Sequence, residues 1–267
     1  MTEYKDFDSA SSLTLLNSIL DQTDEIALKY FRQARGSIGE TQKDDGSYVT
    51  RADKEVERVI RDEIGKVFPG HSVIGEEEGE SPGTDEDFCW VIDPIDGTHG
   101  FMTGLPIWAT LIALRFDNEI LLSVISAPAF RTRWWAIKGE GAYKSDVDNE
   151  ARQLRTSEVK NLNKAQLLFT GTKACEEKWQ KFRDLQAGVW RERGVGDFWG
   201  HCLVAEGASE VMLDPIVSIW DVAALFLLVH EAGGKMTDEL GNEIYTAGHA
   251  VSSNGLIHGE VIDFLNK

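Results

Sequence analysis

The chain has 267 residues, of which 42% are hydrophobic, and it carries a formal net charge of −18. This length allows one large domain or two small ones, with enough apolar residues for a real core. The charge excludes a protein that binds nucleic acid or anionic membranes over a broad surface, because such a surface repels phosphates at long range. It would repel a phosphorylated metabolite as well, unless a strongly positive group lay in the site.

The cysteines and the N-terminal segment indicate the cellular compartment. Cys89, Cys175 and Cys202 form no CxxC pair and no disulfide framework. The first residues lack the basic and apolar stretches of a signal peptide. No run approaches the roughly 20 apolar residues that span a bilayer. We therefore expect a cytoplasmic, soluble, globular protein with no nucleic-acid or membrane partner.

The first half of the chain is predicted to hold two helices followed by strands. Apolar residues recur at near-helical spacing over residues 13–35 and 50–70, and a Pro-Gly pair ends the second pattern. The strands expected after them are short at 71–75 and 89–93, long within 108–128 with a turn at 116–119, and paired as a further hairpin within 132–145.

After about residue 150 the pattern changes to alternating units. Strands are expected at 166–170, 189–193 and 210–214, and helices at 176–187, 197–209 and 218–235, the last of which ends at a glycine C-cap. We find no internal repeat and no low-complexity tract. The interleaving predicts a layered α/β protein in one unit over residues 1–267, with two halves of about 1–150 and 151–267.

The segment DPIDGT, residues 93–98, places two aspartates at the exit of an apolar strand. By itself it is also a good turn sequence. A calcium EF-hand loop that starts at Asp93 would need an oxygen ligand where the chain has Ile95. The Asp-x-Asp-Gly-Thr motif of haloacid-dehalogenase-type phosphatases needs a nucleophile where the chain has Pro94. Neither of these two sites fits the segment.

A metal site fits better. Pro94 holds Asp93 extended at the strand end, and the Ile95 carbonyl and Asp96 follow around the turn. These three hard oxygens are the ligands that Mg²⁺ prefers. Like charges this close need a cation between them.

Three further acids could join this site. Glu76 leaves a strand at the same kind of sheet edge, although its GEEEG segment could also be a solvated acidic run. Asp221 and Asp53 each begin a predicted helix, where either could simply be a helix cap. None of the motifs is specific alone, but their conjunction is.

The set of Asp53, Gly75-Glu76-Glu77, the 93–98 segment and Trp220-Asp221 resembles the inositol monophosphatase family of Mg²⁺-dependent, lithium-sensitive phosphatases. The resemblance runs over nearly the whole chain, including LVAEG and EAGGK in the last third. It implies a layered αβαβα sandwich, shared with fructose-1,6-bisphosphatase, and a homodimer.

The resemblance also implies roles by matched position. Thr98, paired with Asp53, would orient and activate the attacking water, and backbone N–H groups of Gly97 and Thr98 would hold the phosphate. Two to three Mg²⁺ ions would make the acidic site attractive to a phosphate dianion and lower the pKa of a bound water. The ligands of these ions would be Glu76, Asp93, the Ile95 carbonyl, Asp96 and Asp221.

The chain departs from the family after Thr98. Many relatives have Thr-Asn or Lys-Asn there, whereas this chain has His99-Gly100. Because Mg²⁺ prefers oxygen ligands, we interpret His99 as a loop residue.

The substrate is suggested by segments of the second half. GDF…CLVAEG, ISAPAFRTRWWA and VSIWD look more like the histidinol-phosphate phosphatase branch than like inositol phosphatases. Histidinol phosphate has a cationic amine and an imidazole, which Asp197 and Asp214 could bind as acceptors. Asp197 could instead only cap its helix. Trp134 and Trp135 are interpreted as strand packing.

Other functions stay open. An inositol-1-phosphate or sugar-alcohol phosphatase is the main alternative, and a nucleotide 3′-phosphatase is a weaker one. A non-catalytic acidic metal-binding protein would not require both Thr98 and Asp53.

Overall fold

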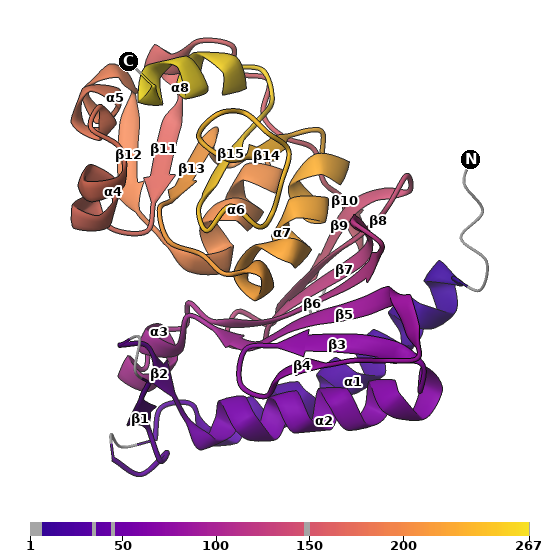
Figure 1. The fold of residues 1–267 in the computed structure, drawn as a ribbon. Coiled ribbons are helices and arrows are strands. Elements are labelled where there is room, and N and C mark those ends of the chain that lie inside the picture. Colours follow the sequence, from indigo (N-terminus) through magenta and orange to yellow (C-terminus); the bar gives the residue numbers. More distant parts are fainter. Residues whose placement is uncertain (1–6, 34–35, 44–45, 147–149, 267) are drawn as a thin grey trace.

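Two long helices form one outer layer of the fold. The structure is a computed structural model that describes residues 7–33, 36–43, 46–146 and 150–266. They are α1 (Ser9–Tyr30) and α2 (Arg51–Val67) (Figure 1). In α2 the buried residues Val56, Ile60 and Ile64 repeat at helical spacing, so one face packs on the first sheet and the other meets solvent. Both predicted helices are thus present. Helix α1 begins four residues and ends five residues before the expected range of 13–35, and α2 is a few residues shorter than the expected 50–70.

The first sheet has eight strands in the order β10-β9-β8-β7-β6-β5-β3-β4. In the described part of the chain its pairings are antiparallel, except that β3 runs parallel to β5. Its central strands are apolar on both faces because helices cover both sides. The strands are β3 (His71–Gly75), β4 (Gly79–Ser81), β5 (Asp85–Asp96), β6 (Ala109–Phe116), β7 (Glu119–Ala127), β8 (Thr132–Ile137), β9 (Gly141–Asp146) and β10 (Arg152–Gln153).

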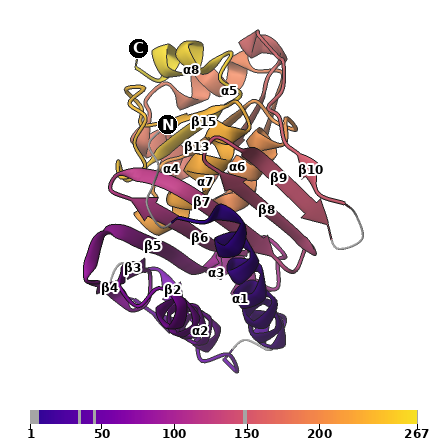
Figure 2. The ribbon, with the colours of Figure 1, turned by 90° about the vertical axis from the view of Figure 1, so that its right-hand side faces the viewer.

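Two helices, α6 (Asp197–Ala205) and α7 (Ile219–Glu231), lie between this sheet and a second one (Figures 1 and 2). Helix α7 contacts β5 to β9 on one side and β14 and β15 on the other. Seven of its thirteen residues are buried, as expected for a helix covered on two sides. Gly233, in the left-handed region with φ 91°, follows the end of α7, as the expected C-cap requires.

The second sheet has five strands in the order β12-β11-β13-β15-β14, and helices cover its far side. Strand β11 runs parallel to both β12 and β13, whereas β15 is antiparallel to β13 and β14. The elements are β11 (Gln166–Phe169), β12 (Arg191–Gly194), β13 (Val211–Asp214), β14 (Lys235–Thr237), β15 (Ala250–Ser253), α4 (Thr172–Lys178), α5 (Phe182–Gly188) and α8 (His258–Leu265).

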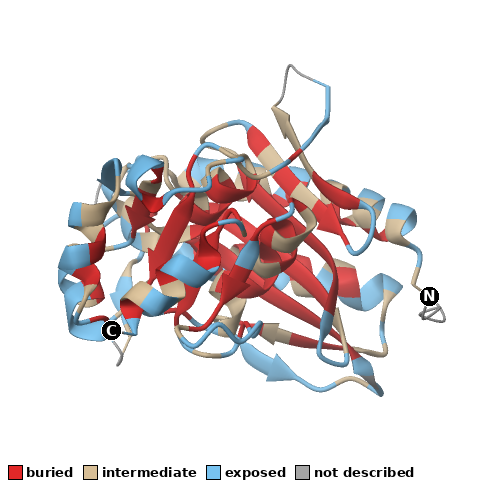
Figure 3. Cartoon of the chain, turned by 90° about the horizontal axis from the view of Figure 1, so that it is seen from above, coloured by how far each residue is buried: buried red, intermediate tan, exposed pale blue. Residues whose placement is uncertain are grey.

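Helices and sheets therefore alternate in five layers, which confirms the predicted αβαβα sandwich. Figure 3 shows buried residues concentrated in the sheets and the helices between them, and exposed ones on the outer helices and loops. Small elements complete the chain: the hairpin of β1 (Thr41–Gln42) and β2 (Tyr48–Val49), helix α3 (Thr98–Thr103) and a 3₁₀ turn at Leu162–Lys164. Of the described helices, none combines the length and apolar character needed to cross a membrane.

Two local predictions differ from the structure, and some short elements were not predicted. The single helix expected at 176–187 is two short helices, because Trp179 adopts an extended backbone and buries its ring. The strand expected at 89–93 extends over Asp85–Asp96, since its neighbours β3 and β6 supply partners along that length. Strands β14 and β15 and helix α8 were not predicted, because they are short and flanked by polar turns.

Candidate active site

The two aspartates of the 93–98 segment face one cleft because β5 is irregular there. Asp93 pairs with Leu111 of β6 and Asp96 pairs with Ala109, so three steps along β5 oppose two along β6. In a regular strand, side chains three residues apart point to opposite faces of the sheet. One extra residue between them turns the second side chain to the same face as the first. The bulge thus explains how both carboxylates reach the same site.

Asp93, Asp96 and Asp221 form an acidic cluster in which one oxygen of each lies within 4.8 Å of the others. Every member also accepts a backbone hydrogen bond. The Asp93 carboxylate accepts from Ile95 N at 3.0 Å and Asp96 accepts from Phe198 N at 2.7 Å. Asp221 accepts from Ser218 N at 2.6 Å, which makes it a helix cap as well. Its remaining oxygen is available to the cluster.

Burial and mutual repulsion raise the pKa values in this cluster. Desolvation, followed by the charges of Glu76 and Asp96, raises the pKa of Asp93 well above its ordinary range. Desolvation and then Asp197 and Asp221 do the same for the pKa of Asp96. For Asp221, burial raises the pKa to about 7. A bound cation would remove this penalty, because it stabilises the charged form of each group.

Glu76 lines the same cleft but pairs with a lysine that the sequence analysis missed. Lys43 Nζ lies 2.8 Å from Glu76 Oε1 and 2.7 Å from Glu77 Oε1, and it comes from the β1–β2 hairpin. Sequence spacing could not find this contact, because 33 residues separate the partners. The GEEEG segment is therefore not a free acidic run.

A buried glutamate holds this segment in place. Glu57 of α2 accepts hydrogen bonds from Glu77 N at 2.8 Å and Glu78 N at 3.1 Å, and Arg61 Nε lies 2.8 Å from it. A Cβ on Gly75 would lie only 2.2 Å from Glu57 Oε1, so a glycine is required for this approach. The orientation of Glu76 thus depends on α2.

Asp53 and Thr98, the predicted water-activating pair, lie together. Asp53 is fully buried, and its Oδ2 accepts from Thr50 N at 2.8 Å, which closes a capping box. Its Oδ1 lies 3.5 Å from Thr98 Oγ1, which also donates to the Ile95 carbonyl at 3.1 Å. Desolvation raises the pKa of Asp53 to about 6. Both the capping and the site interpretation of Asp53 are compatible with this geometry.

The cleft has a volume of about 560 Å³ and gathers the predicted residues from both sheets. Every predicted site residue lines it except Asp53, which lies behind Thr98. The predicted residues that line it are Glu76, Asp93, Ile95, Asp96, Gly97, Thr98, Asp197, Asp214 and Asp221.

The local structure of two residues, His99 and Asp197, differs from the sequence-based expectation. His99 belongs to helix α3, where its ring meets Tyr48 edge-on at 5.1 Å between centroids. Asp197 makes no capping hydrogen bond; it follows the N-cap Gly196 with a positive φ of 56°. Desolvation and the Asp214 charge raise the pKa of Asp197 to about 6. The capping explanation of Asp197 is therefore wrong, and its carboxylate remains in the cleft.

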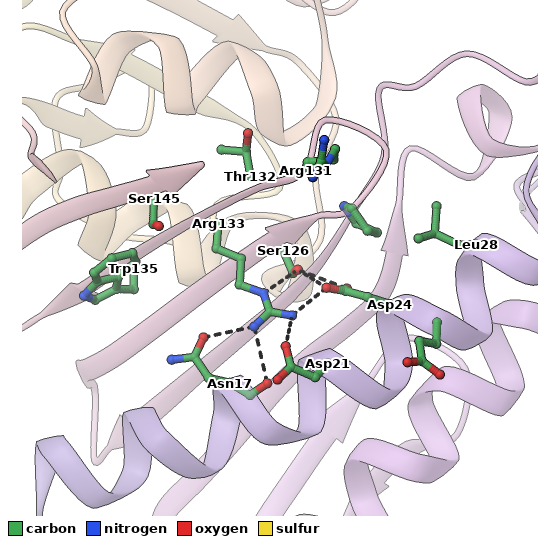
Figure 4. A pocket seen from close by; sticks show the side chains of 12 residues that line it. Asn17, Asp21, Asp24, Leu28, Ser126, Arg131, Thr132, Arg133, Trp135 and Ser145 are labelled. Atoms are coloured by element: carbon green, nitrogen blue, oxygen red, sulfur yellow. Dashed lines mark hydrogen bonds and ion pairs between the residues drawn. The ribbon is translucent and has the colours of Figure 1, made fainter. Parts of the chain in front are cut away.

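A second hollow of about 790 Å³ lies between α1 and strands β7 and β8 (Figure 4). At its base the Arg133 guanidinium donates to Asn17, Asp24 and Ser126 and pairs with Asp21. None of its described lining residues is a predicted site residue. Because the first cleft gathers the predicted site residues and the Arg133 guanidinium of this hollow is already paired, the first cleft is the candidate active site.

The tryptophans of β8 pack as expected for strand residues. Trp134 is buried in the core and its Nε1 donates to Glu206 Oε1 at 2.8 Å. Trp135 stacks on Tyr143 of β9 at 5.7 Å. Neither residue lines the candidate active site.

Comparison with known proteins shows the family to which a chain with this site belongs. The model of the inositol monophosphatase family matches residues 11–265. The chain belongs to this family. A histidinol-phosphatase of Mycobacterium tuberculosis is 41% identical over 260 residues, which cover 97% of this chain and 99% of the relative. A histidinol-phosphatase of Streptomyces coelicolor is 38% identical over 266 residues, with coverage of 97% and 98%.

Solved structures agree with the family assignment. The extragenic suppressor protein suhB of Bartonella henselae matches with a TM-score of 0.88 and 25% identity, covering 96% of this chain and 99% of that one. An inositol monophosphatase of Thermotoga maritima matches with a TM-score of 0.84 and 28% identity, covering 96% and 97%. The family suggests dependence on a divalent metal, and the all-oxygen donors of the acidic cluster fit a hard divalent cation.

Proposed function

We propose that this chain is a Mg²⁺-dependent phosphatase that hydrolyses histidinol phosphate to histidinol and phosphate. One observation is central: Asp93, Asp96 and Asp221 approach within 4.8 Å in a cleft that also holds Asp197 and Asp214. The first three groups suit a hard cation, and the other two suit a cationic substrate. The proposed metal ligands are Glu76, Asp93, the Ile95 carbonyl, Asp96 and Asp221.

The chemistry divides between the metal and the protein. Bound Mg²⁺ would supply a water of lowered pKa and offset the phosphate charge. Asp53 is suited to accept a proton from the attacking water through Thr98 when the Thr98 hydroxyl donates to Asp53 Oδ1, 3.5 Å away, in place of the Ile95 carbonyl. The pKa of Asp53, about 6, lies close to neutral, as this role requires. Backbone N–H groups of Gly97 and Thr98 would hold the phosphate oxygens. The mechanism needs no covalent intermediate.

The substrate assignment rests on charge and on the relatives. Two curated relatives named histidinol-phosphatase align with nearly the whole chain. The amine and imidazole of histidinol phosphate are donors, and Asp197 and Asp214 present acceptors on the second-sheet side of the cleft. A polyol such as inositol would gain less from two carboxylates, since it carries no positive charge.

Further properties belong to the same proposal. The protein would act in the cytoplasm on a small phosphorylated metabolite, within histidine biosynthesis, as a homodimer that lithium inhibits. It would hold two to three Mg²⁺ ions and have no nucleic-acid or membrane partner. Residues 1–267 would form one phosphatase domain with halves of about 1–150 and 151–267.

Phosphate release with Mg²⁺ tests the proposal directly, by comparing kcat/KM for histidinol phosphate and inositol-1-phosphate. We expect a preference of about tenfold or more for histidinol phosphate, which corresponds to about 1.4 kcal/mol in transition-state binding. An equal or reversed ratio would refute the substrate and favour a broad inositol-phosphate phosphatase. Absence of turnover on both compounds and on other small monoesters would favour a non-catalytic metal-binding protein.

A further inference from the structure

A histidine lies directly behind Asp214, outside the set of predicted site residues. His201 belongs to α6 and is 1% exposed. In the pairing of β13 with β15, Met212 lies opposite Ser252, so Asp214 and Ser252 share one face of the second sheet. Helix α6 packs closely on this face, because a Cβ on Gly200 would lie 2.4 Å from Met212 Sδ. The fold therefore brings His201 between Ser252 and Asp214.

The contacts of the two ring nitrogens differ. His201 Nδ1 lies 2.7 Å from Ser252 Oγ, a normal hydrogen-bond distance. Nε2 lies 3.8 Å from Asp214 Oδ2 and has no hydrogen-bond partner among the residues that the structure describes. A buried polar nitrogen without a partner is costly, so its presence beside the cleft calls for a functional explanation.

The surroundings select one tautomer of His201. A proton on Nδ1 would leave the Nε2 lone pair facing the Asp214 carboxylate, which is repulsive. A proton on Nε2 directs an N–H at Asp214 and lets Nδ1 accept from the Ser252 hydroxyl. The arrangement is thus Ser252 O–H to His201 Nδ1, and His201 Nε2–H toward Asp214.

We propose that His201 is a positioning residue for substrate specificity: with Ser252 it holds the Asp214 carboxylate in place for a cationic group of the substrate. The inference rests on the proposed function, in which Asp214 binds histidinol phosphate. An imidazole N–H is suited to this task because it can orient the carboxylate without the permanent positive charge of a lysine or arginine. A lysine or arginine in its place would neutralise Asp214 and compete with the substrate.

Two substitutions at His201 separate its two contacts. In H201Q the side-chain amide can replace the Nε2 donor, and in H201N the shorter amide can replace only the contact of Nδ1 with Ser252. We expect H201N to raise KM for histidinol phosphate roughly tenfold relative to KM for inositol-1-phosphate, with kcat nearly unchanged, since the N–H directed at the Asp214 carboxylate is lost. H201Q should keep most of the wild-type preference.

The substitution S252A is the second test. It leaves the imidazole in place but removes the hydroxyl that donates to Nδ1, so the tautomer of His201 is no longer fixed. It should shift the ratio of the two KM values in the same direction as H201N, by a smaller factor. Melting temperatures of all variants identify any general loss of folding, which would affect both substrates equally.

The outcomes distinguish the two proposals. If the wild type prefers histidinol phosphate and H201N keeps that preference, the role of His201 is refuted and the proposed function stands. The same conclusion follows if H201N and H201Q change KM for both substrates by the same factor. A wild type without the preference refutes the proposed function, and the inference falls with it.

Discussion

Asp53 and Asp221 occupy the same position, N3, of two different helices, and each closes a capping box with the residue before its helix. Each carboxylate uses one oxygen for the helix terminus. The other oxygen of Asp53 lies 3.5 Å from Thr98 Oγ1, and Asp221 belongs to the acidic cluster of the cleft. From the sequence, capping and site chemistry were alternatives for both residues. The structure shows that a short side chain at N3 can serve both purposes.

The Asp53→Asn substitution tests the water-activating pair. The asparagine oxygen can still accept from Thr50 N, so α2 should keep its cap, but the side chain can no longer take up a proton. We expect kcat to fall about a hundredfold or more, with a nearly unchanged melting temperature and metal affinity. Phosphate release, thermal unfolding and calorimetric Mg²⁺ titration measure the three quantities.

Asp62→Asn is the matched control, since it makes the same change on the exposed face of the same helix. Its turnover should equal that of the wild type. Full activity in Asp53→Asn would refute the role given to Asp53.

At the scale of elements, patterns of apolar residues predicted the layers but not the contacts between them. Helical spacing predicted α2, and two apolar runs joined by a turn at 116–119 predicted the β6–β7 hairpin. The bulge at Asp93 and Asp96 was not predictable, because it depends on the register with β6. Lys43 and His201 were missed for a similar reason: Glu76 lies 33 residues from Lys43, and Ser252 lies 51 residues from His201.

The contact between α2 and the GEEEG turn yields a prediction at this scale. In Glu57→Gln, an amide NH2 group replaces one of the two oxygens that accept hydrogen bonds from Glu77 N and Glu78 N. This new donor also faces Arg61. The turn should loosen and Glu76 should lose its fixed orientation. We expect metal affinity to fall about tenfold to a hundredfold, the usual effect of removing a partner that orients a ligand.

Calorimetric titration of the purified protein with Mg²⁺ or Mn²⁺ measures this affinity without relying on turnover. Glu63→Gln is the control, because this carboxylate pairs with Lys66 at the surface of the same helix. Equal metal affinities in the two variants would show that the turn holds its shape without Glu57.

For the whole molecule, the buried carboxylates couple stability to pH. Burial raises the pKa of Asp53 and Asp197 to about 6 and that of Asp221 to about 7, from 3.8. The folded state therefore holds protons that the unfolded state has released between about pH 4 and pH 7. Since the folded state binds more protons in this window, its free energy of unfolding falls as the pH rises.

We expect the metal-free protein to melt at a lower temperature at pH 8 than at pH 5. Added Mg²⁺ should raise the melting temperature more at pH 8, because protons no longer compete for the carboxylates. Calorimetric melting with a chelator and with Mg²⁺ at both pH values checks this. A Mg²⁺ effect that is equal at both pH values, or larger at pH 5, would contradict it.

The cleft draws its carboxylates from both sides of the connection between β10 and β11. Glu76, Asp93 and Asp96 of the cleft precede this connection, as does Asp53 behind Thr98, whereas Asp197, Asp214 and Asp221 follow it. A chain divided there would leave neither fragment with the complete set of acids, and α7 would have to fold against the partner's sheet. The phosphatase could therefore serve as a split reporter, whose activity returns only when two proteins fused to its fragments bring them together.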